Sequence, residues 1–433
     1  MTPVRAWGRL SAHPHLLQAL TDRSTVAQSL AASPWPGLAH GMGRSYGDSC
    51  LNPEGTLWMM RGLDHFIAFD PDTGRLVCEA GVLLRDIQRL MVQRGWLLPV
   101  IPGTQMVTVG GAIANDVHGK NHHAQGSFGE HVLGFTLVRT DGQTLRCSPT
   151  ENADWFAATV GGLGLTGVIT QAELQLRRVA GPWMDTETLP YGSLDEFFDI
   201  SDQSDANWEH GVSWIDCLSG AGSRGLFMRA NHSRATAGPA APTQQRRMPF
   251  VPPISLVNRL SLRPFNTAYF HLKRWQAGRS LQHVEPFNHP LDNLLEWNRM
   301  YGPRGFYQYQ SVVPRSVGGD AVTAMLQAIQ RSGQGSFLAV LKTFGERTAP
   351  GMLSFPMPGV TLALDFPNRG EQTHRLMGQL DAIVREANGR LYAAKDARMP
   401  KDLWGSGYPR LNEFLAFRDP GISSGFSRRV MDF

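Results

Sequence analysis

Two glycine-rich segments constrain the fold of this chain more than any other feature of the sequence. The longer one runs from Pro102 to Gly129 (PGTQMVTVGGAIANDVHGKNHHAQGSFG), and the shorter one runs from Gly41 to Asp48 (GMGRSYGD). Both combine small residues, turn residues and hydroxyls, which is typical of a backbone that presses against a ligand. Glycine lets backbone N–H groups come close and adopt positive φ, and runs of such groups bind anions such as a pyrophosphate. The two segments therefore predict a cofactor that is held from two sides.

The composition limits the classes to which the chain can belong. Its 433 residues are 42% hydrophobic and 18% charged, which is ordinary for a globular protein of two or three domains. We find no run of about 18 apolar residues, which a membrane-spanning helix would need. The N-terminus also lacks the continuous apolar core of a signal peptide. We therefore expect a cytoplasmic protein.

Neither the cysteines nor the histidines form a metal-binding pattern. The cysteines are scattered, without a CxxC pair, so we expect reduced and mostly buried thiols. Nothing in the sequence places them in a pocket: Cys50, Cys78, Cys147 and Cys217. The run HGKNHH (His118 to His123) contains three histidines, but its glycine and asparagine favour a loop, and no carboxylate or cysteine completes a ligand set. We expect no metal.

Basic residues are concentrated in one window although the net charge is only +4. Between Cys217 and Val284 there is no aspartate or glutamate, whereas arginines, lysines and aromatic residues alternate there. Such a mixture suits an anionic membrane surface or a phosphate. An equally open alternative is a solvated basic face whose acidic partners lie elsewhere in the fold. No nucleic-acid-binding motif accompanies the charge, so we expect no nucleic-acid partner.

Periodicity gives a coarse outline of the chain. Residues 1–35 are expected to be a helical lead-in, and Leu83 to Trp96 has the apolar spacing of a helix. GFTLVRTDGQTLRCSP predicts a hairpin that turns at Asp141-Gly142. Further on, strands such as FYQYQSVV and TLALDFP alternate with helices such as DAVTAMLQAIQRS. Strands and helices alternating over an antiparallel sheet indicate an α+β fold.

One motif invites a different fold and is rejected here. Gly162, Gly164 and Gly167 fit GxGxxG, the dinucleotide fingerprint, which has a mechanism only where it follows a strand and opens a helix. Here it follows the helical segment ENADWFAATVGG. It precedes an alternating strand from Ala172 to Leu176. The order is inverted, so we do not predict a Rossmann domain.

Five further segments, in the same order along the chain, reveal a family resemblance. They are HGKNHHAQGSFGEHV, FAATVGGLGLTGVI, EWNRMYGPRGFYQYQ, LSFPMPGVTLALDFP and GRLYAAKDAR. Together with the two glycine-rich segments they resemble the vanillyl-alcohol-oxidase (PCMH-type) FAD oxidoreductases, and among these the polyprenylphosphoryl-ribose 2′-oxidases. The resemblance implies a two-domain α+β fold with an FAD-binding domain over 1–180. It also implies an antiparallel-sheet substrate domain over 181–387 and a C-terminal segment, 388–433, that returns to the FAD domain.

The resemblance assigns cofactor contacts to both glycine-rich segments and to two later positions. The implied FAD-binding residues are His40, Gly41, Met42, Gly43, Arg44, Ser45, Tyr46, Gly47, Gly103, Thr104, Thr108, Gly110, Gly111, Ala114, Asn115, His118, Gly119, Ile169 and Tyr392. Many relatives tether the flavin through a histidine at the position that Arg44 holds here, and RSYGD contains no histidine. We therefore expect noncovalent FAD.

The resemblance also assigns chemistry to a few side chains. Lys395 would stabilise charge near the reducible end of the flavin or act as a base, with His118 and Tyr46 as further catalytic candidates. The implied substrate pocket contains Gln308, Gln310, Lys342 and Ala363, of which Ala363 stands where mycobacterial relatives carry a cysteine. Gln308 and Gln310 are expected to point the same way along one strand.

The function that follows is oxidation of a sugar hydroxyl to a ketone. The resemblance favours the 2′-hydroxyl of a polyprenylphosphoryl-ribose, on the way to an arabinose donor, with a separate NAD(P)H-dependent keto-sugar reductase as partner. A lipid-linked substrate would suit peripheral contact of residues 217–284 with the inner membrane face. The alternatives are a soluble aldonolactone or alditol oxidase (for example one similar to D-arabinono-1,4-lactone oxidase) and a flavin-binding, membrane-docking protein without turnover.

Overall fold

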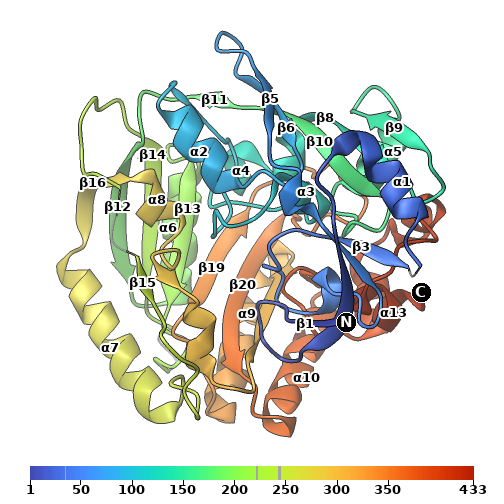
Figure 1. The fold of residues 1–433 in the computed structure, drawn as a ribbon. Coiled ribbons are helices and arrows are strands. Elements are labelled where there is room, and N and C mark those ends of the chain that lie inside the picture. Colours follow the sequence, from blue (N-terminus) through green and yellow to red (C-terminus); the bar gives the residue numbers. More distant parts are fainter. Residues whose placement is uncertain (35, 221–222, 242–244) are drawn as a thin grey trace.

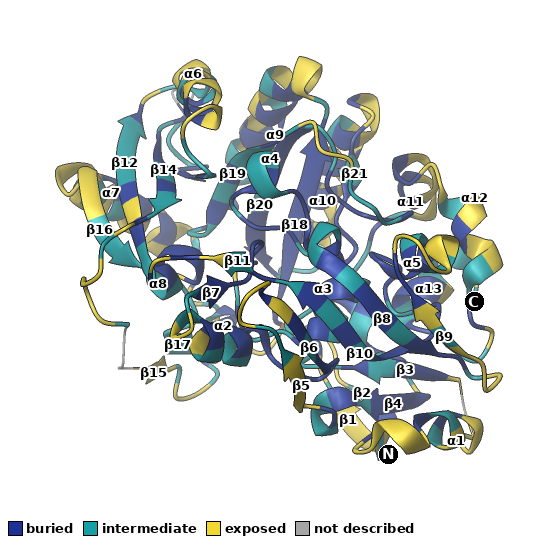
Figure 2. Ribbon diagram, turned by 90° about the horizontal axis from the view of Figure 1, so that it is seen from above, coloured by how far each residue is buried: buried dark blue, intermediate teal, exposed yellow. Residues whose placement is uncertain are grey.

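The computed structural model describes residues 1–34, 36–220, 223–241 and 245–433. Within these ranges the chain is an α+β protein, as predicted, with one large antiparallel sheet beside two smaller sheets (Figure 1). The strands of these sheets are mostly buried, whereas the outward faces of the surrounding helices are exposed (Figure 2).

The first small sheet overturns one expectation about the N-terminus. In the order β1-β2-β4-β3 it contains β1 (Thr2–Val4), β2 (His13–Ala19), β4 (Thr56–Met59) and β3 (Gly37–His40). The predicted helical lead-in is therefore wrong, because α1 spans only Val26–Ala31. Proline cannot donate a helical hydrogen bond, and Pro3 and Pro14 face each other across β1 and β2 instead. Strand β4 pairs in parallel with both β2 and β3.

The second small sheet carries most of the predicted local structure. Its antiparallel strands, in spatial order, are β5 (Phe66–Phe69), β6 (Arg75–Glu79), β10 (Val168–Gln175), β8 (Val132–Val138) and β9 (Thr144–Cys147). The predicted hairpin is confirmed, since β8 pairs with β9 and Gly142 has a φ of +88° in the turn. Short strands β7 (Trp96–Leu97) and β11 (Arg177–Arg178) pair beside this sheet.

Besides α1, four helices lie between strands of the small sheets in the described part of the chain. They are α2 (Leu84–Val92), α3 (Val109–Ala114), α4 (His122–Gln125) and α5 (Ala153–Thr159). Helix α2 confirms the predicted apolar period, because Leu84, Ile87 and Met91 are buried. Helix α4 corrects the expectation that HGKNHH is all loop. GxGxxG lies between α5 and β10, helix first and strand second, so the rejection of a Rossmann domain is confirmed.

The large sheet is antiparallel throughout the described strands. Its order is β16 (Gly278–His283), β12 (Trp183–Tyr191), β14 (Gly225–His232), β13 (His210–Ile215), β19 (Ala339–Phe344), β20 (Gly359–Pro367), β18 (Phe306–Val313) and β21 (Arg390–Leu391). Helices α6 (Leu194–Asp205), α9 (Gly318–Ser332) and α10 (Glu371–Glu386) pack against it. Helix α7 (Arg259–Trp275) lies on the opposite face.

Side-chain alternation along β14 shows the two faces directly. Phe227 packs against Phe197 of α6, with ring centroids 6.0 Å apart. The neighbouring Leu226 points the other way and clusters with Trp214 and with Phe270 of α7. Successive residues of a strand face opposite sides of a sheet. The sheet therefore has one face covered by α6, α9 and α10 and another face covered partly by α7.

The C-terminal segment crosses back to the N-terminal sheets. It contains α11 (Lys401–Gly407), α12 (Leu411–Phe414) and α13 (Gly425–Met431). Ile422 bridges to Gly37 of β3, and the Gly37 amide donates to the Gly421 carbonyl at 2.9 Å. Asp419 accepts a hydrogen bond from the Thr140 amide in the β8–β9 turn. Residues from both ends of the chain thus share one neighbourhood. The short elements β15 (Arg246–Arg247), α8 (Val284–Asn288) and β17 (Leu294–Leu295) lie near α7 in the chain.

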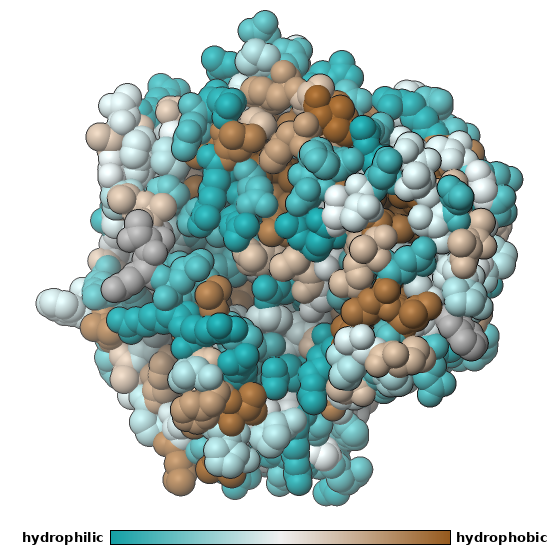
Figure 3. Space-filling model, in the orientation of Figure 1, coloured by the Kyte–Doolittle hydropathy of each residue, from teal (hydrophilic) through white to brown (hydrophobic). Residues whose placement is uncertain are grey.

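Apolar side chains are exposed on and beside α7. We call this group the α7 surface, and it contains Phe250, Ile254, Leu260, Leu272 and Trp275. Leu260 is 88% exposed and Trp275 is 83% exposed, which is unusual for residues of this size. The face in Figure 3 carries apolar patches among hydrophilic side chains at the lower left, where Figure 1 places α7. No helix in the described part of the chain has the length and apolar character needed to cross a membrane.

Candidate active site

A cavity of about 1080 Å³ lies between the small sheets and the α7 face of the large sheet. Its volume is at the upper end of the range that ligand pockets usually show. Most of the residues that the sequence nominated line it: Gly41, Met42, Gly43, Arg44, Ser45, Tyr46, Gly103, Thr104, Thr108, Gly110, Gly111, Ala114, Asn115, His118, Gly119, Ile169, Gln308, Gln310, Lys342, Ala363, Tyr392 and Lys395. Residues far apart in the sequence thus form one site.

Two nominated cofactor residues, His40 and Gly47, do not line the cavity. The His40 side chain is buried and its Nδ1 lies 2.8 Å from the carbonyl oxygen of Cys50. A Cβ atom added to Gly47 would lie 2.0 Å from the Asp396 carbonyl oxygen. Glycine is therefore required at 47 for close packing of two backbones rather than for contact with a ligand.

The two glycine-rich segments touch each other at the cavity wall. A Cβ atom on Gly41 would lie 2.6 Å from Oγ1 of Thr108, which itself caps α3 by accepting from the Gly111 amide. Gly43 has a φ of +59°, a conformation that favours glycine. By contrast, a Cβ atom on Gly103 would meet no atom within 4 Å, so this backbone is open to a ligand. The two segments therefore form the cavity wall from two sides.

The rejected GxGxxG motif nevertheless contributes to the cavity. Gly164 and Gly167 line it, and a Cβ atom on Gly164 would meet nothing within 4 Å. Gly164 has a φ of +74°. Sequence reasoning tested this motif against one fold only and missed its role as a third stretch of open backbone.

Lys395 lies in a buried cluster with acidic and aromatic groups. Its Nζ atom is 4.2 Å from the ring centroid of Tyr46. Burial lowers the pKa of Lys395 to about 8, against the attraction of the Asp365 carboxylate. Burial also raises the pKa of Asp365, while Lys395 opposes that shift. Burial and Asp365 keep the pKa of Tyr46 well above its usual value, so this phenol stays protonated.

Asp365 is a site residue that sequence reasoning missed. It lies opposite Gln308 in the β18–β20 register and accepts from the Gln308 amide at 2.8 Å. Its side chain is fully buried, and Tyr301 donates to its other oxygen at 3.5 Å. Asp365 belongs to the segment TLALDFP, whose strand is buried along nearly its whole length. An aspartate in such a strand is rarely left without a partner, so its presence indicates a functional or paired carboxylate. Its position predicts control of the charge on Lys395.

His118 is enclosed by aromatic rings beside Gln310. The Gln310 amide donates to Nε2 of His118 at 3.1 Å, while rings of Phe344, Phe355 and Tyr392 lie around it. Burial, with the charges of Lys342 and its neighbours, lowers the pKa of His118 well below its usual value. The imidazole is therefore neutral. Its buried Nδ1 has no hydrogen-bond partner among the described residues.

Lys342 and Lys120 line the same cavity as Lys395. Lys342 donates to the Gly119 carbonyl at 2.9 Å, and burial, with the charges of Lys120 and Lys395, lowers its pKa to about 7. Lys120 donates to the Phe287 carbonyl, and burial lowers its pKa to about 7. The pattern HGKNHH directs attention to its histidines and does not by itself indicate a role for Lys120. Amines with lowered pKa values in one cavity indicate a functional site.

One cysteine lies in the cavity, contrary to expectation. Cys50 lines the wall, whereas Ala363 of β20 lies opposite Gln310 and carries no nucleophilic atom. Burial raises the pKa of the Cys50 thiol to about 12, so it stays protonated and unreactive.

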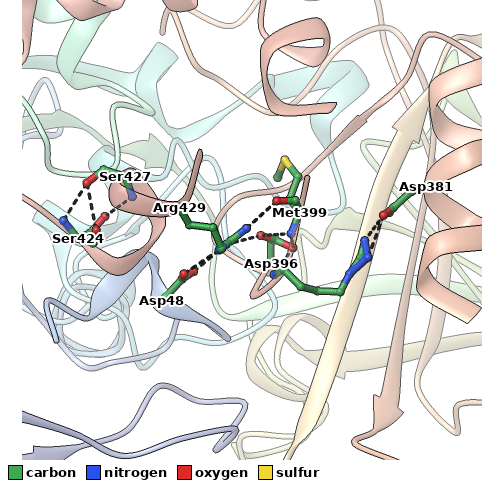
Figure 4. Close-up of polar contacts among 8 residues, drawn as sticks. Asp48, Asp381, Asp396, Met399, Ser424, Ser427 and Arg429 are labelled. Carbon is green, nitrogen blue, oxygen red and sulfur yellow. Dashed lines mark hydrogen bonds and ion pairs between the residues drawn. The ribbon is translucent and has the colours of Figure 1, made fainter. Parts of the chain in front are cut away.

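An arginine joins three segments behind the cavity wall (Figure 4). Arg429 of α13 makes two contacts of 2.9 Å with Asp48, the last residue of the shorter glycine-rich segment. The same guanidinium donates to Asp396 at 2.8 Å and to the Met399 carbonyl at 2.7 Å. Since the Tyr46 amide also donates to the Ala394 carbonyl, the first loop and the Lys395 segment are held together. We call Arg429, Asp48 and Asp396 the Arg429 clamp.

The cavity fits a flavin dinucleotide. The backbone at Gly103 and Gly164 leaves room for a ligand. The buried atoms Arg44 Nε and His118 Nδ1 have no hydrogen-bond partner among the described residues. The Arg44 guanidinium stacks on Trp7 at 4.1 Å, and burial lowers its pKa. A half-buried cation, open backbone and a polar far wall provide the kinds of contact that a flavin needs.

Comparison with known proteins gives the class. Residues 19–148 match the FAD binding domain family. The chain is 36% identical over 451 aligned residues to decaprenylphosphoryl-beta-D-ribose oxidase of Mycolicibacterium smegmatis, covering 99% of this chain and 97% of that protein. The chain therefore belongs to the vanillyl-alcohol-oxidase (PCMH-type) family of FAD-linked oxidases.

Other relatives match in part or lack an assigned activity. An uncharacterised protein of Streptomyces coelicolor is 32% identical over 370 residues, which is 81% of this chain and all of that protein. L-gulonolactone oxidase of Mus musculus is 33% identical over 124 residues, or 28% of each chain. Together with the cavity, these findings make the protein an FAD-dependent oxidoreductase.

Proposed function

We propose that the protein oxidises the 2′-hydroxyl of a polyprenylphosphoryl-ribose to a ketone. The observation that carries the proposal is a single cavity in which the glycine-rich cradle faces a polar wall of Gln308, Gln310, Lys342 and Lys395. A sugar and its phosphate offer the hydroxyls and anionic oxygens that amides and amines bind. The similarity to decaprenylphosphoryl-beta-D-ribose oxidase over nearly the whole chain supports this substrate class.

The side chains divide the chemistry among them. Bound FAD supplies a hydride acceptor for alcohol oxidation. Lys395, whose pKa is about 8, takes the hydroxyl proton in its neutral form and returns to the ammonium. Asp365 positions that ammonium, and Gln310 with neutral His118 orients the sugar. Lys342 binds the phosphate. The flavin is held without a covalent bond, because Arg44 stands at the tethering position.

The lipid part of the substrate implies contact with a membrane. Arg259, Arg263, Lys273 and Arg274 of α7 have no ion-pair partner among the described residues. Elsewhere in the basic window, Arg224 pairs with Asp216, Arg229 and Arg279 pair with Glu187, and Arg247 pairs with Glu296. Residues 217–284 therefore contain both basic groups that are paired with acidic residues elsewhere in the fold and basic groups that are available to an anionic membrane. We propose that α7 contacts the cytoplasmic face of the inner membrane. We also propose that a separate NAD(P)H-dependent reductase consumes the keto product.

Anaerobic flavin reduction tests the proposed function. The purified yellow protein is mixed with decaprenylphosphoryl-ribose, L-gulonolactone or a buffer blank, and absorbance near the flavin maximum is followed. We expect bleaching by the lipid-linked ribose alone. Bleaching by the lactone alone would establish a lactone oxidase instead. Bleaching by neither would favour a flavin-binding protein without turnover on these substrates.

A further inference from the structure

The cavity continues well beyond the residues that serve the flavin and the sugar. On the large sheet its lining extends from β18 and β20 across β13 and β14 to β12: Val212, Trp214, Leu226, Met228, Thr186 and Thr188. Strand β12 is four strands away from β20 in the sheet order. At a strand spacing of about 4.8 Å, this extension is about 19 Å long. A ribose and a phosphate do not need such a distance.

Helix α7 covers this extension. Leu262, Phe265 and Tyr269 of α7 line the same cavity. The Tyr269 ring packs on the Trp214 ring of β13, with centroids 4.8 Å apart, which fixes α7 to the sheet at one edge of the extension. The Phe265 ring stacks beside the Tyr269 ring at 6.0 Å. We call the space between α7 and β12–β14–β13 the α7 channel. Apolar and aromatic groups from helix and sheet dominate its walls, and among the α7 residues that line it Lys273 alone is charged, within the described chain.

The α7 channel opens to an apolar part of the surface. Leu256 and Phe265 both line the cavity, yet each is 49% exposed. They therefore stand where the cavity wall meets the protein surface. Leu260 of the α7 surface lies between these two residues in the chain, and Trp275 lies at the C-terminal end of the same helix. An apolar channel that ends at an exposed apolar surface suits a ligand that is itself long and apolar.

We infer that the α7 channel binds the isoprenoid chain of the substrate, next to its phosphate. This inference rests on the proposed function and adds the location of the lipid. The proximal isoprene units lie between α7 and the sheet, where burying each methylene is favourable. The distal units leave past Leu256 and Phe265 toward the α7 surface. Chain recognition then contributes to kcat/KM in addition to recognition of the sugar.

The experiment compares three substrates that share the ribosyl phosphate. They are decaprenylphosphoryl-ribose, farnesylphosphoryl-ribose and methylphosphoryl-ribose, each at subsaturating concentration in the same detergent with anaerobic stopped-flow detection of flavin reduction. For the unmodified protein we expect kcat/KM to be at least about tenfold higher with farnesyl than with methyl. Met228→Trp fills the channel and should lower kcat/KM with the prenyl substrates about tenfold or more, but leave the methyl substrate within about twofold.

Two further variants make the result decisive. Thr188→Phe fills the channel at its far end and replaces Met228→Trp if that variant does not fold. Val317→Trp adds the same bulk at a partly exposed apolar position before α9 and should change nothing. Equal kcat/KM for all three substrates, or an equal loss with all three in both channel variants, would overturn the channel. Failure of every prenylphosphoryl-ribose to bleach the unmodified flavin would instead overturn the proposed function.

Discussion

The chemistry depends at the residue scale on Lys395 and on the carboxylate that faces it. A lysine with an ordinary pKa would be almost entirely protonated at neutral pH, but burial lowers the pKa of Lys395 to about 8. Roughly a tenth of such a group is then neutral at pH 7. The Asp365 carboxylate favours the ammonium form and so limits how far the pKa of Lys395 falls. Burial raises the pKa of Asp365 itself. The pair therefore sets how much free base is present.

The pH dependence of flavin reduction follows from this pair. Because the neutral amine is the reactive form, the rate with substrate should rise as pH increases through about 8. Lys395→Met should retain FAD, slow reduction by about 10²-fold or more and abolish the rise. Lys401→Met, at an exposed lysine paired with Asp432, serves as the control and should behave like the unmodified protein. A rate that falls as pH rises through 8 would mean that Lys395 acts as a cation.

Arg44 determines a second outcome at this scale. Its guanidinium stacks on Trp7, and His40 lies outside the cavity with its Nδ1 directed to the Cys50 carbonyl. Neither residue offers an imidazole to the flavin. Precipitation with acid should therefore release all the flavin to the supernatant, where its fluorescence is measured. Flavin fluorescence in the washed pellet would contradict noncovalent binding.

At the scale of elements, sequence patterns predict those helices, turns and strands whose conformation depends on residues close together in the chain. The α2 period, the β8–β9 turn and the alternation of Gln308 and Gln310 on β18 depend on local spacing, and both glutamines do line the cavity. The N-terminal strands were missed, since β2 exists through pairing with β1 and β4. A seven-residue strand that pairs in parallel with a segment 40 residues away leaves little local signal.

Contacts between elements that are distant in the chain could not be predicted from the sequence either. Gly47 was assigned to the cofactor, but its need for glycine comes from the Asp396 backbone, far along the chain. Lys120 and Asp365 entered the site because β19, β20 and the second loop meet there. The family resemblance located Lys395, whereas only the fold shows what holds it. That support is the Arg429 clamp.

The Arg429 clamp gives a prediction about this support. Arg429→Met leaves the Asp48 and Asp396 carboxylates without this ion-pair partner, and their side chains are only 25% and 8% exposed. We expect the free energy of unfolding to fall by about 2 kcal/mol and flavin reduction to slow, with Arg429→Lys intermediate in both. Arg410→Met removes an exposed pair with Glu413 and should change stability by less than about 0.5 kcal/mol. Chemical denaturation and stopped-flow reduction measure the two effects. A variant that loses stability but reduces its flavin at the unmodified rate would exclude a positioning role.

At the scale of the whole molecule, the cofactor cradle, the polar wall and α7 surround one cavity. Leu256, beside α7, and Phe265 of α7 line this cavity and are also half exposed, so the cavity reaches the surface next to this helix. The sequence predicted the α+β class and the basic, aromatic segment 217–284, but it could not show that α7, within this segment, covers the cavity. Helix α7 packs its buried residues on β13 and β14, and this long-range contact has no local signature.

Membrane association is the prediction that belongs to this scale. The protein should float with anionic vesicles and less so as salt increases, since each basic residue near the surface adds about 1 kcal/mol. Leu260→Glu together with Trp275→Glu should abolish flotation without affecting FAD content. Leu415→Glu, at an exposed position on the C-terminal segment, is the control. Flotation that depends on neither lipid charge nor salt would argue for a solvated basic face.

The central claim is oxidation at the 2′ carbon of a lipid-linked ribose, and the product itself tests it most directly. Decaprenylphosphoryl-ribose is incubated with the protein, and the product is reduced with sodium borodeuteride before mass spectrometry of the released sugar. We predict a loss of two hydrogens on oxidation, followed by one deuterium at C2, in proportion to the flavin reduced, and formed at least about 10²-fold more slowly with Lys395→Met. Deuterium at another carbon, or flavin reduction without a keto-sugar, would contradict the account.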